Sequence, residues 1–554
     1  MGSGSYIFAF VVMLGVLVFV HELGHFLVAK ACGVRVLKFS LGFGSPVGFG
    51  RFRMAWTRGG TEYVVAWIPL GGFVKMLGES LDATEDDEAA AHPDETLNGK
   101  PLWQKLSIVF AGPAMNLAFP VLVFSLMLSV GLQNQDTTIG TVEEGSPAAE
   151  AGFLPGDRIT QIANEPVTWW RDVASVIREH PGASVEVAFE RDGAAGVGRL
   201  PVGERSLFNE FGIVEKFGWS GLAHSRLRAM LAIPDPDAAA LAAGLRSGDV
   251  VTAVNGVDVE DWHGFATAYA AERGPVSVLV ARGVEEDAEE VTLELPARGD
   301  VGALGVSPAA VLIEETVEGS PADRAGLQAE DIVLAVDGQH MGSFAAFSNT
   351  VKTSGGRTLS LAVSRAGETL QLDVTPELTP LDNGLATEDQ YFVGVSVQPT
   401  TLVGSMALDR ERNPFVSVPR AVGMTVDLTV TMVRGVGKLI TGEVSRKNIA
   451  GPIGIAQIAG NALAIGWETY LQVMVFISIN LGILNLLPIP ILDGGQALIY
   501  SVEGIRRAPL SLRMREIIQH FGLTVLLLLM GLAFWNDISR HWSTFVDWFR
   551  DGTG

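Results

Sequence analysis

Four long apolar segments constrain this chain more than any other feature of its 554 residues. Each is near or above the roughly 20 residues that a helix needs to cross a bilayer. Two lie near the start of the chain and two near its end, and ordinary polar sequence fills the middle. The segments run from about Tyr6 to Ala31, Leu106 to Val130, Thr469 to Leu487 and Ile517 to Phe534. The sequence therefore predicts a polytopic α-helical membrane protein with four transmembrane helices and a large inserted soluble region.

Basic residues give the predicted orientation, because Lys- and Arg-rich loops stay on the cytoplasmic side. Two loops are basic, one after the first span and one between the third and fourth spans. They hold Lys30, Arg35, Lys38, Arg51, Arg53, Arg58 and Lys75 in the first, and Arg506, Arg507, Arg513 and Arg515 in the second. The large middle region should then be extracytoplasmic. The net charge of -23 argues against nucleic acid as a main partner. The single cysteine, Cys32, excludes an intramolecular disulfide and a Cys-rich metal site.

The loop after the first span combines glycine-rich and β-prone sequence. Leu41 to Gly50 is rich in glycine, and Tyr63 to Ile68 is rich in β-branched and aromatic residues. Pro69, Leu70, Gly71 and Gly72 then form a turn signal. This pattern predicts a β-hairpin with apolar tips. Such a hairpin would either associate with the membrane, with protein covering its edges, or lie in the cytoplasm.

The middle region contains an internal repeat. Its three copies are AGFLPGDRITQIANEPV from Ala151, AGLRSGDVVTAVNGVDV from Ala243 and AGLQAEDIVLAVDGQHM from Ala325. Each predicts a helix end, a turn, an acidic residue, a strand and a second turn, and each resembles a PDZ domain of the bacterial protease type. The copies would bind a peptide along a sheet edge or serve as a spacer or size filter.

After the repeats, Val416 to Gly442 is apolar but interrupted by charged residues. It is predicted to be an amphipathic helix on the outer membrane surface rather than a fifth span. Six regions follow: 1–134 with two spans and the hairpin loop; PDZ-like domains at 135–205, 206–298 and 299–398; a membrane-surface helical segment at 399–465; and the last two spans at 466–554.

The motif His21-Glu22-Leu23-Gly24-His25 lies late in the first span. Histidines four residues apart share one helix face, so both imidazoles can reach one metal ion, and imidazole suits zinc. Zinc lowers the pKa of a coordinated water to about 7, and Glu22 can then act as the general base. The alternative is a structural cluster that only hydrogen-bonds neighbouring helices.

A catalytic zinc needs a third protein ligand and an open fourth position. The best candidate is Asp493, which follows the third span. Pro488 and Pro490 break the helix before it, and Gly494 and Gly495 permit a tight turn beside the ion. Because the first and third spans run in the same direction, the HELGH motif and Asp493 should lie at similar depth near the cytoplasmic face.

These motifs together resemble the site-2 protease family of intramembrane metalloproteases. HELGH with Leu492-Asp493-Gly494 is that family's signature, and the segment Gly112 to Asn116 (GPAMN) looks like its GxxxN element. The order of segments most resembles the regulator-of-sigma-E protease branch. Two features depart from that branch: three repeats stand where it usually has two, and Gln496 stands where many relatives have histidine.

The resemblance implies a zinc metalloendopeptidase with Zn²⁺ on His21, His25 and Asp493 and with Glu22 as catalytic base. The substrate would be a single-pass transmembrane protein, of the anti-sigma-factor or remnant-signal-peptide type, cut after an earlier ectodomain cleavage. The hairpin would enter the bilayer and hold the substrate as an extended strand. Substrate contacts would come from Gly71, Gly72, Asn116, Asn485, Pro488 and Pro490. The PDZ-like domains would meet a peptide C-terminus or a trimmed ectodomain, and the protein would lie in a bacterial inner membrane.

Two other functions fit the residues less well. A membrane-anchored PDZ scaffold with a structural metal site would need no general base, yet Glu22 stands beside the ligands. A metal transporter would need further intramembrane carboxylates or histidines along a path, and the predicted spans hold only this one cluster. The sequence therefore favours the protease.

Overall fold

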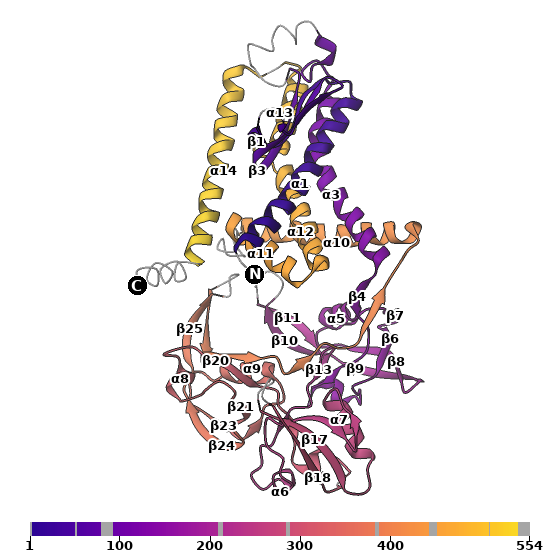
Figure 1. Cartoon of the computed structure of the whole chain (residues 1–554), viewed down its shortest axis with the longest axis vertical. Helices are drawn as coiled ribbons and strands as arrows, with labels where there is room; N and C mark the ends of the chain where they lie inside the picture. The colour runs from indigo at the N-terminus through magenta and orange to yellow at the C-terminus, as the bar shows by residue number, and fades with distance from the viewer. Residues whose placement is uncertain are drawn as a thin grey trace. The chain divides into compact units, whose positions relative to one another are not determined.

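The structure is a computed structural model that describes residues 3–540, apart from 50–51, 79–91, 144, 209–213, 284–287, 298, 383–386, 442–450 and 509. The chain divides into two compact units (Figure 1). The helical unit joins Met1–Leu132 with Asp409–Gly554, and the repeat unit is Gln133–Leu408. This division agrees with the expected insertion of a soluble region between two membrane-embedded parts.

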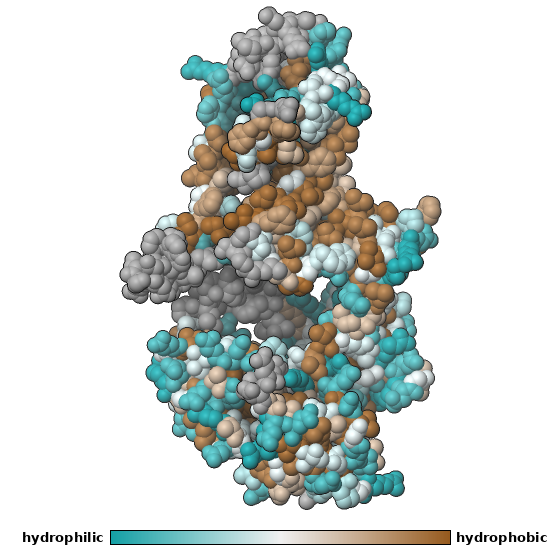
Figure 2. Space-filling view, viewed as in Figure 1, coloured by the Kyte–Doolittle hydropathy of each residue, from teal (hydrophilic) through white to brown (hydrophobic). Residues whose placement is uncertain are grey.

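Seven helices of ten or more residues are described in the helical unit. They are α1 (Ser3–Ala31), α3 (Leu102–Val130), α10 (Pro414–Thr441), α11 (Pro452–Ile465), α12 (Trp467–Leu486), α13 (Asp493–Arg506) and α14 (Leu512–Arg540), with the short η2 (Pro93–Glu95) before α3. Apolar side chains form the contacts between them and also cover much of the unit's surface in Figure 2. Such an all-round apolar helix bundle is what a bilayer requires.

Five described helices are long and apolar enough to cross a membrane, judged by length and composition. Four correspond to the expected spans, and the fifth is α10. In Figure 1, α10 runs across the direction of α14. One face of α10 packs on its neighbours through Ala421 and Met432, while Val418, Val422, Val426 and Val430 are exposed. The count of four spans, with α10 on the membrane surface, stays a prediction.

The loop after α1 folds into a three-stranded antiparallel sheet of order β1-β3-β2, in which β2 and β3 are consecutive paired strands. The strands are β1 (Val36–Pro46), β2 (Ala55–Arg58) and β3 (Thr61–Met76). The glycine-rich segment is itself extended, and β1 pairs with two parts of β3: Leu41 lies opposite both Val65 and Gly72. Phe39 of β1 packs edge-on against Phe19 and Phe26 of α1, so the sheet is fixed to the helix that carries HELGH.

The sheet also exposes large apolar side chains. Phe49 is 81% exposed and Phe52 76% exposed, and Trp56, Trp67 and Ile68 are each more than half exposed. Exposed aromatic side chains in this density are typical of a surface that meets a membrane or another protein. Entry of the sheet into the bilayer stays a prediction.

The repeat unit contains three separate hydrophobic cores, one for each copy of the repeat. The first copy has α4 (Pro147–Glu150), α5 (Trp170–Glu179) and the sheet β7-β6-β8-β9; the second has α6 (Ala239–Ala242), α7 (Trp262–Ala271) and β16-β15-β17-β18; the third has α8 (Pro321–Arg324), α9 (Phe344–Lys352) and β24-β23-β21-β20-β27 with β22. The strands of the first two sheets are β6 (Arg158–Ile162), β7 (Glu165–Pro166), β8 (Ser184–Arg191), β9 (Ala194–Pro201), β15 (Val250–Val254), β16 (Val257–Asp258), β17 (Val276–Arg282) and β18 (Glu289–Leu295). Those of the third are β20 (Leu312–Thr316), β21 (Ile332–Val336), β22 (Gln339–His340), β23 (Leu359–Arg365), β24 (Glu368–Val374) and β27 (Val395–Gln398). The shared order of elements explains why the sequence repeats.

Short strand pairs cross the predicted domain boundaries at 205 and 298. β5 (Thr141–Val142) pairs with β12 (Leu222–Ala223), and β14 (Leu231–Ala232) pairs with β19 (Ser307–Pro308). The first and second repeats therefore each pair with a strand that lies beyond residue 205 and residue 298, respectively. The remaining elements are β4 (Leu132–Gln135), β10 (Gly203–Phe208), β11 (Val214–Trp219), β13 (Arg226–Leu227), η3 (Gly302–Leu304), β25 (Glu377–Asp382), β26 (Thr387–Phe392), β28 (Thr401–Leu402) and β29 (Met406–Asp409).

Each repeat is stabilised by the same buried ion pair. The acidic residue of the repeat motif is fully buried and accepts two bonds from an arginine on a later strand. The third copy shows the geometry: Arg365 donates to both Asp331 oxygens at 2.7 Å and to the Gly326 carbonyl at 2.6 Å. The equivalent pairs are Asp157–Arg191 and Asp249–Arg282. In each case the bond raises the pKa of the arginine, because it favours the charged guanidinium.

Candidate metal centre

Three predicted ligands, distant in sequence, meet in the helical unit. His21 Nε2 lies 3.2 Å from His25 Nε2 and 3.2 Å from Asp493 Oδ2, and His25 Nε2 lies 3.6 Å from the same oxygen. The three side chains are only 12%, 11% and 16% exposed. Among the described residues, this is the group of His, Cys, Asp or Glu side chains arranged to hold a metal ion.

The spacing of these atoms fits a tetrahedral ion. With bonds of about 2.0 to 2.1 Å, a tetrahedral ion separates its ligand atoms by about 3.3 to 3.4 Å, close to the separations found here. Asp493 Oδ2 is buried and has no hydrogen-bond partner of normal geometry within the described part of the chain. Two nitrogens and one oxygen are a donor set that zinc accepts, and three protein ligands leave a fourth position open.

Helix α1 supplies Glu22 beside the ligands. Glu22 is close enough to His21, His25 and Asp493 to interact electrostatically with all three. Its stem lies against β3: a Cβ atom at Gly72 would come within 3.0 Å of Glu22 Cγ and 2.8 Å of Val18 Cγ1. The sheet and the expected catalytic base are therefore in direct contact.

Helix α3 approaches the two histidines through positions spaced four residues apart. The Ile108 carbonyl accepts the His25 Nδ1 proton at 2.8 Å, which leaves Nε2 free for a metal. A Cβ atom at Gly112 would lie 2.3 Å from His25 Nε2. Asn116 contacts His21 Nδ1 at 3.2 Å. Gly24 of α1 likewise lets α3 approach closely, since a Cβ at Gly24 would lie 2.3 Å from the Ala111 carbonyl oxygen.

The segment between α12 and α13 brings Asp493 to the histidines. Asp493 is the first residue of α13, and the two following glycines are buried in its first turn. A Cβ at Gly494 would lie 2.3 Å from the Leu486 carbonyl oxygen, and one at Gly495 would lie 2.1 Å from that of Ile489. Both glycines are thus required by close packing rather than by an unusual backbone angle. Helix α13, of 14 residues, lies within the region predicted as the loop between the third and fourth spans.

The predicted substrate residues fall into three groups. Gly71 and Gly72 lie in β3, and Gly72 reaches Glu22. Asn485 is half-buried in the last turn of α12, Pro488 is exposed, and Pro490 packs beside Gly522 of α14. Asn116 differs from all of these, because it is completely buried and contacts a metal ligand.

Three groups that help to hold the helices around the site were not predicted from the sequence. The Ile108 carbonyl carries no side-chain signal. Ser478 of α12 donates to the Asn116 carbonyl at 2.8 Å, and its hydroxyl within an apolar span was a usable signal. Asp537 of α14 is buried and accepts the backbone N–H groups of Gly451, Ile453 and Gly454 at 2.9 to 3.1 Å. That carboxylate therefore caps the first backbone N–H groups of α11. Helix α11 in turn packs against α1.

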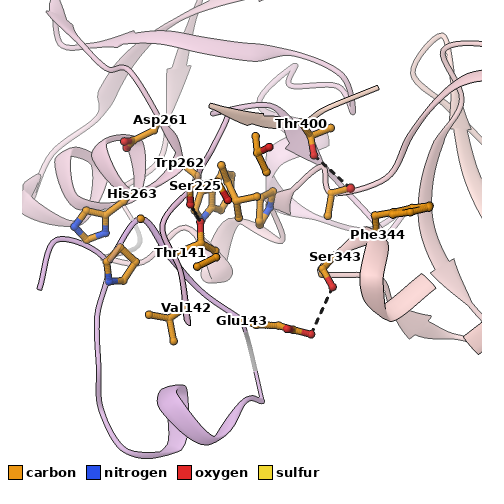
Figure 3. Close-up of a pocket in the computed structure, with 18 of the residues that line it drawn as sticks. Thr141, Val142, Glu143, Ser225, Asp261, Trp262, His263, Ser343, Phe344 and Thr400 are labelled. Atoms are coloured by element: carbon orange, nitrogen blue, oxygen red, sulfur yellow. Dashed lines mark hydrogen bonds between the residues drawn. The ribbon is translucent and has the colours of Figure 1, made fainter. Parts of the chain in front are cut away.

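A separate hollow lies within the repeat unit (Figure 3). It has a volume of about 710 Å³ and is lined by residues of all three repeats. These include Val142 and Glu143 from the first, Trp262 and His263 from the second, and Ser343 and Phe344 from the third. Its lining is mainly apolar, with scattered hydroxyl groups.

A polytopic helical protein with a buried His–His–Asp centre and an adjacent glutamate is a membrane metallopeptidase in its fold and site. The family model described as Peptidase family M50 matches residues 9–529. The chain therefore belongs to peptidase family M50, and it is a zinc metalloprotease of the site-2 type.

Individual relatives match nearly the full length. The regulator of sigma-E protease RseP of Escherichia coli (strain K12) is 32% identical over 539 residues, covering 96% of this chain and 98% of that protein. Protease RseP of Yersinia pestis is 32% identical over 536 residues, with the same coverage. A solved PDZ domain of an SdrC-like protein from Listeria monocytogenes covers 17% of this chain and 90% of that domain, at 15% identity and a TM-score of 0.14.

Proposed function

We propose that this protein cleaves a peptide bond within the transmembrane segment of a single-pass membrane protein. The observation that carries the proposal is the convergence of His21, His25 and Asp493 inside an apolar helical unit, with Glu22 beside them. A protease whose ligands lie on such helices reaches substrates that soluble proteases do not. Relatives named regulator of sigma-E protease support a role in sigma-E regulation. A protein of the anti-sigma-factor type and a remnant signal peptide both have the single-pass form that the proposal requires.

His21 Nε2, His25 Nε2 and Asp493 Oδ2 would hold the zinc ion. When bound there, zinc supplies an activated water and polarises the substrate carbonyl. Glu22 accepts the water proton and delivers it to the leaving nitrogen. The buried surroundings of the site limit access of bulk water and so strengthen these charge interactions.

A helical peptide bond is shielded by its own hydrogen bonds, so the substrate must be extended before attack. The sheet provides a template for this state, because Gly72 of β3 is in contact with Glu22. An extended substrate could add to a strand edge near that contact and regain backbone hydrogen bonds. Asn485, Pro488 and Pro490 would line the substrate on the opposite side.

The proposed location is a bacterial inner membrane, with the repeat unit outside and the metal centre near the cytoplasmic face. The basic residues that follow α1, and those between α12 and the apolar part of α14, support this orientation.

The first test compares the purified protein in detergent with its Glu22→Gln variant and with a chelator-treated sample, using a model single-pass substrate. Glu22→Gln should lose cleavage while retaining zinc, because Gln cannot accept the proton. The chelated sample should regain cleavage when zinc is restored. Absence of cleavage by the unmodified, zinc-loaded protein across several substrates would favour a scaffold instead.

We also propose that the repeat unit excludes substrates with bulky ectodomains, so that an earlier cut must precede cleavage. Three cores in one compact unit and the cavity between them support a size filter with room for a trimmed peptide end. Deleting residues 135 to 398 should permit cleavage of untrimmed substrates. If the deletion variant still cuts trimmed substrates only, the filter is wrong.

A further inference from the structure

Asn116 is the buried polar residue closest to the metal centre that the proposed chemistry leaves without a role. It is 0% exposed. Its side-chain Nδ2 lies 3.2 Å from His21 Nδ1, and its Oδ1 is buried without a hydrogen-bond partner within the described residues, so the amide must turn over for Oδ1 to face the ring. Burying an amide costs free energy unless its donor and acceptor groups are hydrogen-bonded.

Asn116 is held firmly in place. Its backbone carbonyl accepts the hydroxyl of Ser478 from α12 at 2.8 Å, so two helices fix its position. Ile108, Gly112 and Asn116 follow one another at intervals of four along α3, which places them on one face of the helix. The same face therefore orients His25 through Ile108, gives the rings space at Gly112 and contacts His21 at Asn116.

The tautomer of His21 decides which amide end must face it. If the amide nitrogen donates to Nδ1, the ring proton lies on Nε2, and that atom cannot bind a metal. If the amide oxygen accepts the Nδ1 proton, the lone pair of Nε2 is free. Nε2 is the His21 atom aimed at His25 and Asp493, so metal binding requires the oxygen to face the ring.

We propose that Asn116 is a positioning residue for the metal centre, whose side-chain oxygen accepts the Nδ1 proton of His21 and directs Nε2 toward the ion. Asn116 would fix the tautomer of His21 in the way that the Ile108 carbonyl fixes the tautomer of His25. This reverses the expectation that Asn116 contacts substrate. The inference rests on the proposed ligand role of His21, His25 and Asp493.

The test measures zinc affinity by chelator competition, together with the visible spectrum of the Co²⁺-substituted full-length protein. The variants are Asn116→Ala, which removes the acceptor, and Asn116→Asp, which keeps an acceptor oxygen. Ser125→Ala is the matched control, because it removes a buried hydroxyl without a partner from the same helix. His21→Ala reports whether the ligand assignment itself holds.

We expect Asn116→Ala to bind zinc about 10- to 100-fold more weakly, as for other partners of metal-bound histidines. Its Co²⁺ spectrum should change, whereas Asn116→Asp should retain affinity and Ser125→Ala should match the parent. Unchanged affinity and spectrum in Asn116→Ala, with an increased KM, would assign Asn116 to substrate and overturn the inference. Equal zinc affinity in His21→Ala would instead overturn the proposed metal site.

Discussion

Gly112 lies so close to His25 that a single methyl group would separate the helices that carry them. A Cβ at position 112 would lie 2.3 Å from His25 Nε2 and 2.8 Å from His21 Cε1. The glycine is thus part of the metal centre without offering a ligand, since it provides the space in which both rings converge.

Gly112→Ala should therefore lower zinc occupancy and activity together. The added methyl must displace an imidazole or push α3 away from α1, and either change spoils the ligand spacing. Zinc content by atomic absorption and proteolysis of a model substrate measure the effect. Gly15→Ala is the control, because a Cβ at that α1 position meets no atom within 4 Å. Normal zinc content in Gly112→Ala would contradict the packing argument.

Gly72→Ala should reduce activity by about 100-fold with zinc retained, the scale expected when a reacting group is misplaced by roughly 1 Å. The new methyl would press on Glu22 Cγ, Val18 and the Ser40 carbonyl rather than on a ligand. Activity and zinc content measured on the same sample separate the two effects. Thr57→Ala on the exposed strand β2 should leave both unchanged. Loss of zinc from Gly72→Ala would place the strain at the ligands instead.

Arg365→Leu should destabilise the third repeat by about 3 kcal/mol. It leaves the Asp331 carboxylate buried and unpaired, and the 29% exposure of Arg365 puts the cost at the low end for buried pairs. Hydrogen exchange of β21 and β23 amides in the full-length protein reports the opening free energy. Arg357→Leu breaks the exposed pair with Asp337 and should cost no more than about 1 kcal/mol. Equal effects of the two changes would refute the special role of the buried pair.

Asp537→Ala should loosen the start of α11 by about 1 to 2 kcal/mol, because three backbone N–H groups lose their shared acceptor. Faster hydrogen exchange near residues 451–456 measures this change. Asp427→Asn, an exposed position on α10, is the control. If exchange near 451–456 stays at the parental rate, other contacts fix the helix start.

The sequence allowed the chemistry of the site to be predicted better than its surroundings. HELGH and Asp493 carry ligand side chains in rare positions, so their convergence could be predicted from spacing and membrane depth. The Ile108 carbonyl could not, because every residue has one and only packing decides which carbonyl meets His25. The role that we propose for Asn116 differs from the substrate contact expected from the motif, because a motif names a residue without showing which way its amide faces.

Fold prediction failed where local preference and tertiary pairing compete. The glycine-rich segment was expected to belong to a hairpin, but its double pairing with β3 could not be foreseen from its glycines. Helix α13 was missed because two prolines and two glycines suggested a turn, whereas both glycines lie within its first helical turn. The arginine partners of the repeats were within reach of sequence reasoning. Arg191, Arg282 and Arg365 follow their aspartates at nearly the same distance in each copy.

The three predicted ligands of the metal centre are synthesised at very different times. His21 and His25 lie on the first helix, whereas Asp493 follows some 470 residues later. A growing chain that has already inserted α1 thus holds two of the three ligands until almost its entire length has been translated. Ribosomal synthesis itself therefore delays completion of the metal centre until most of the chain has been made.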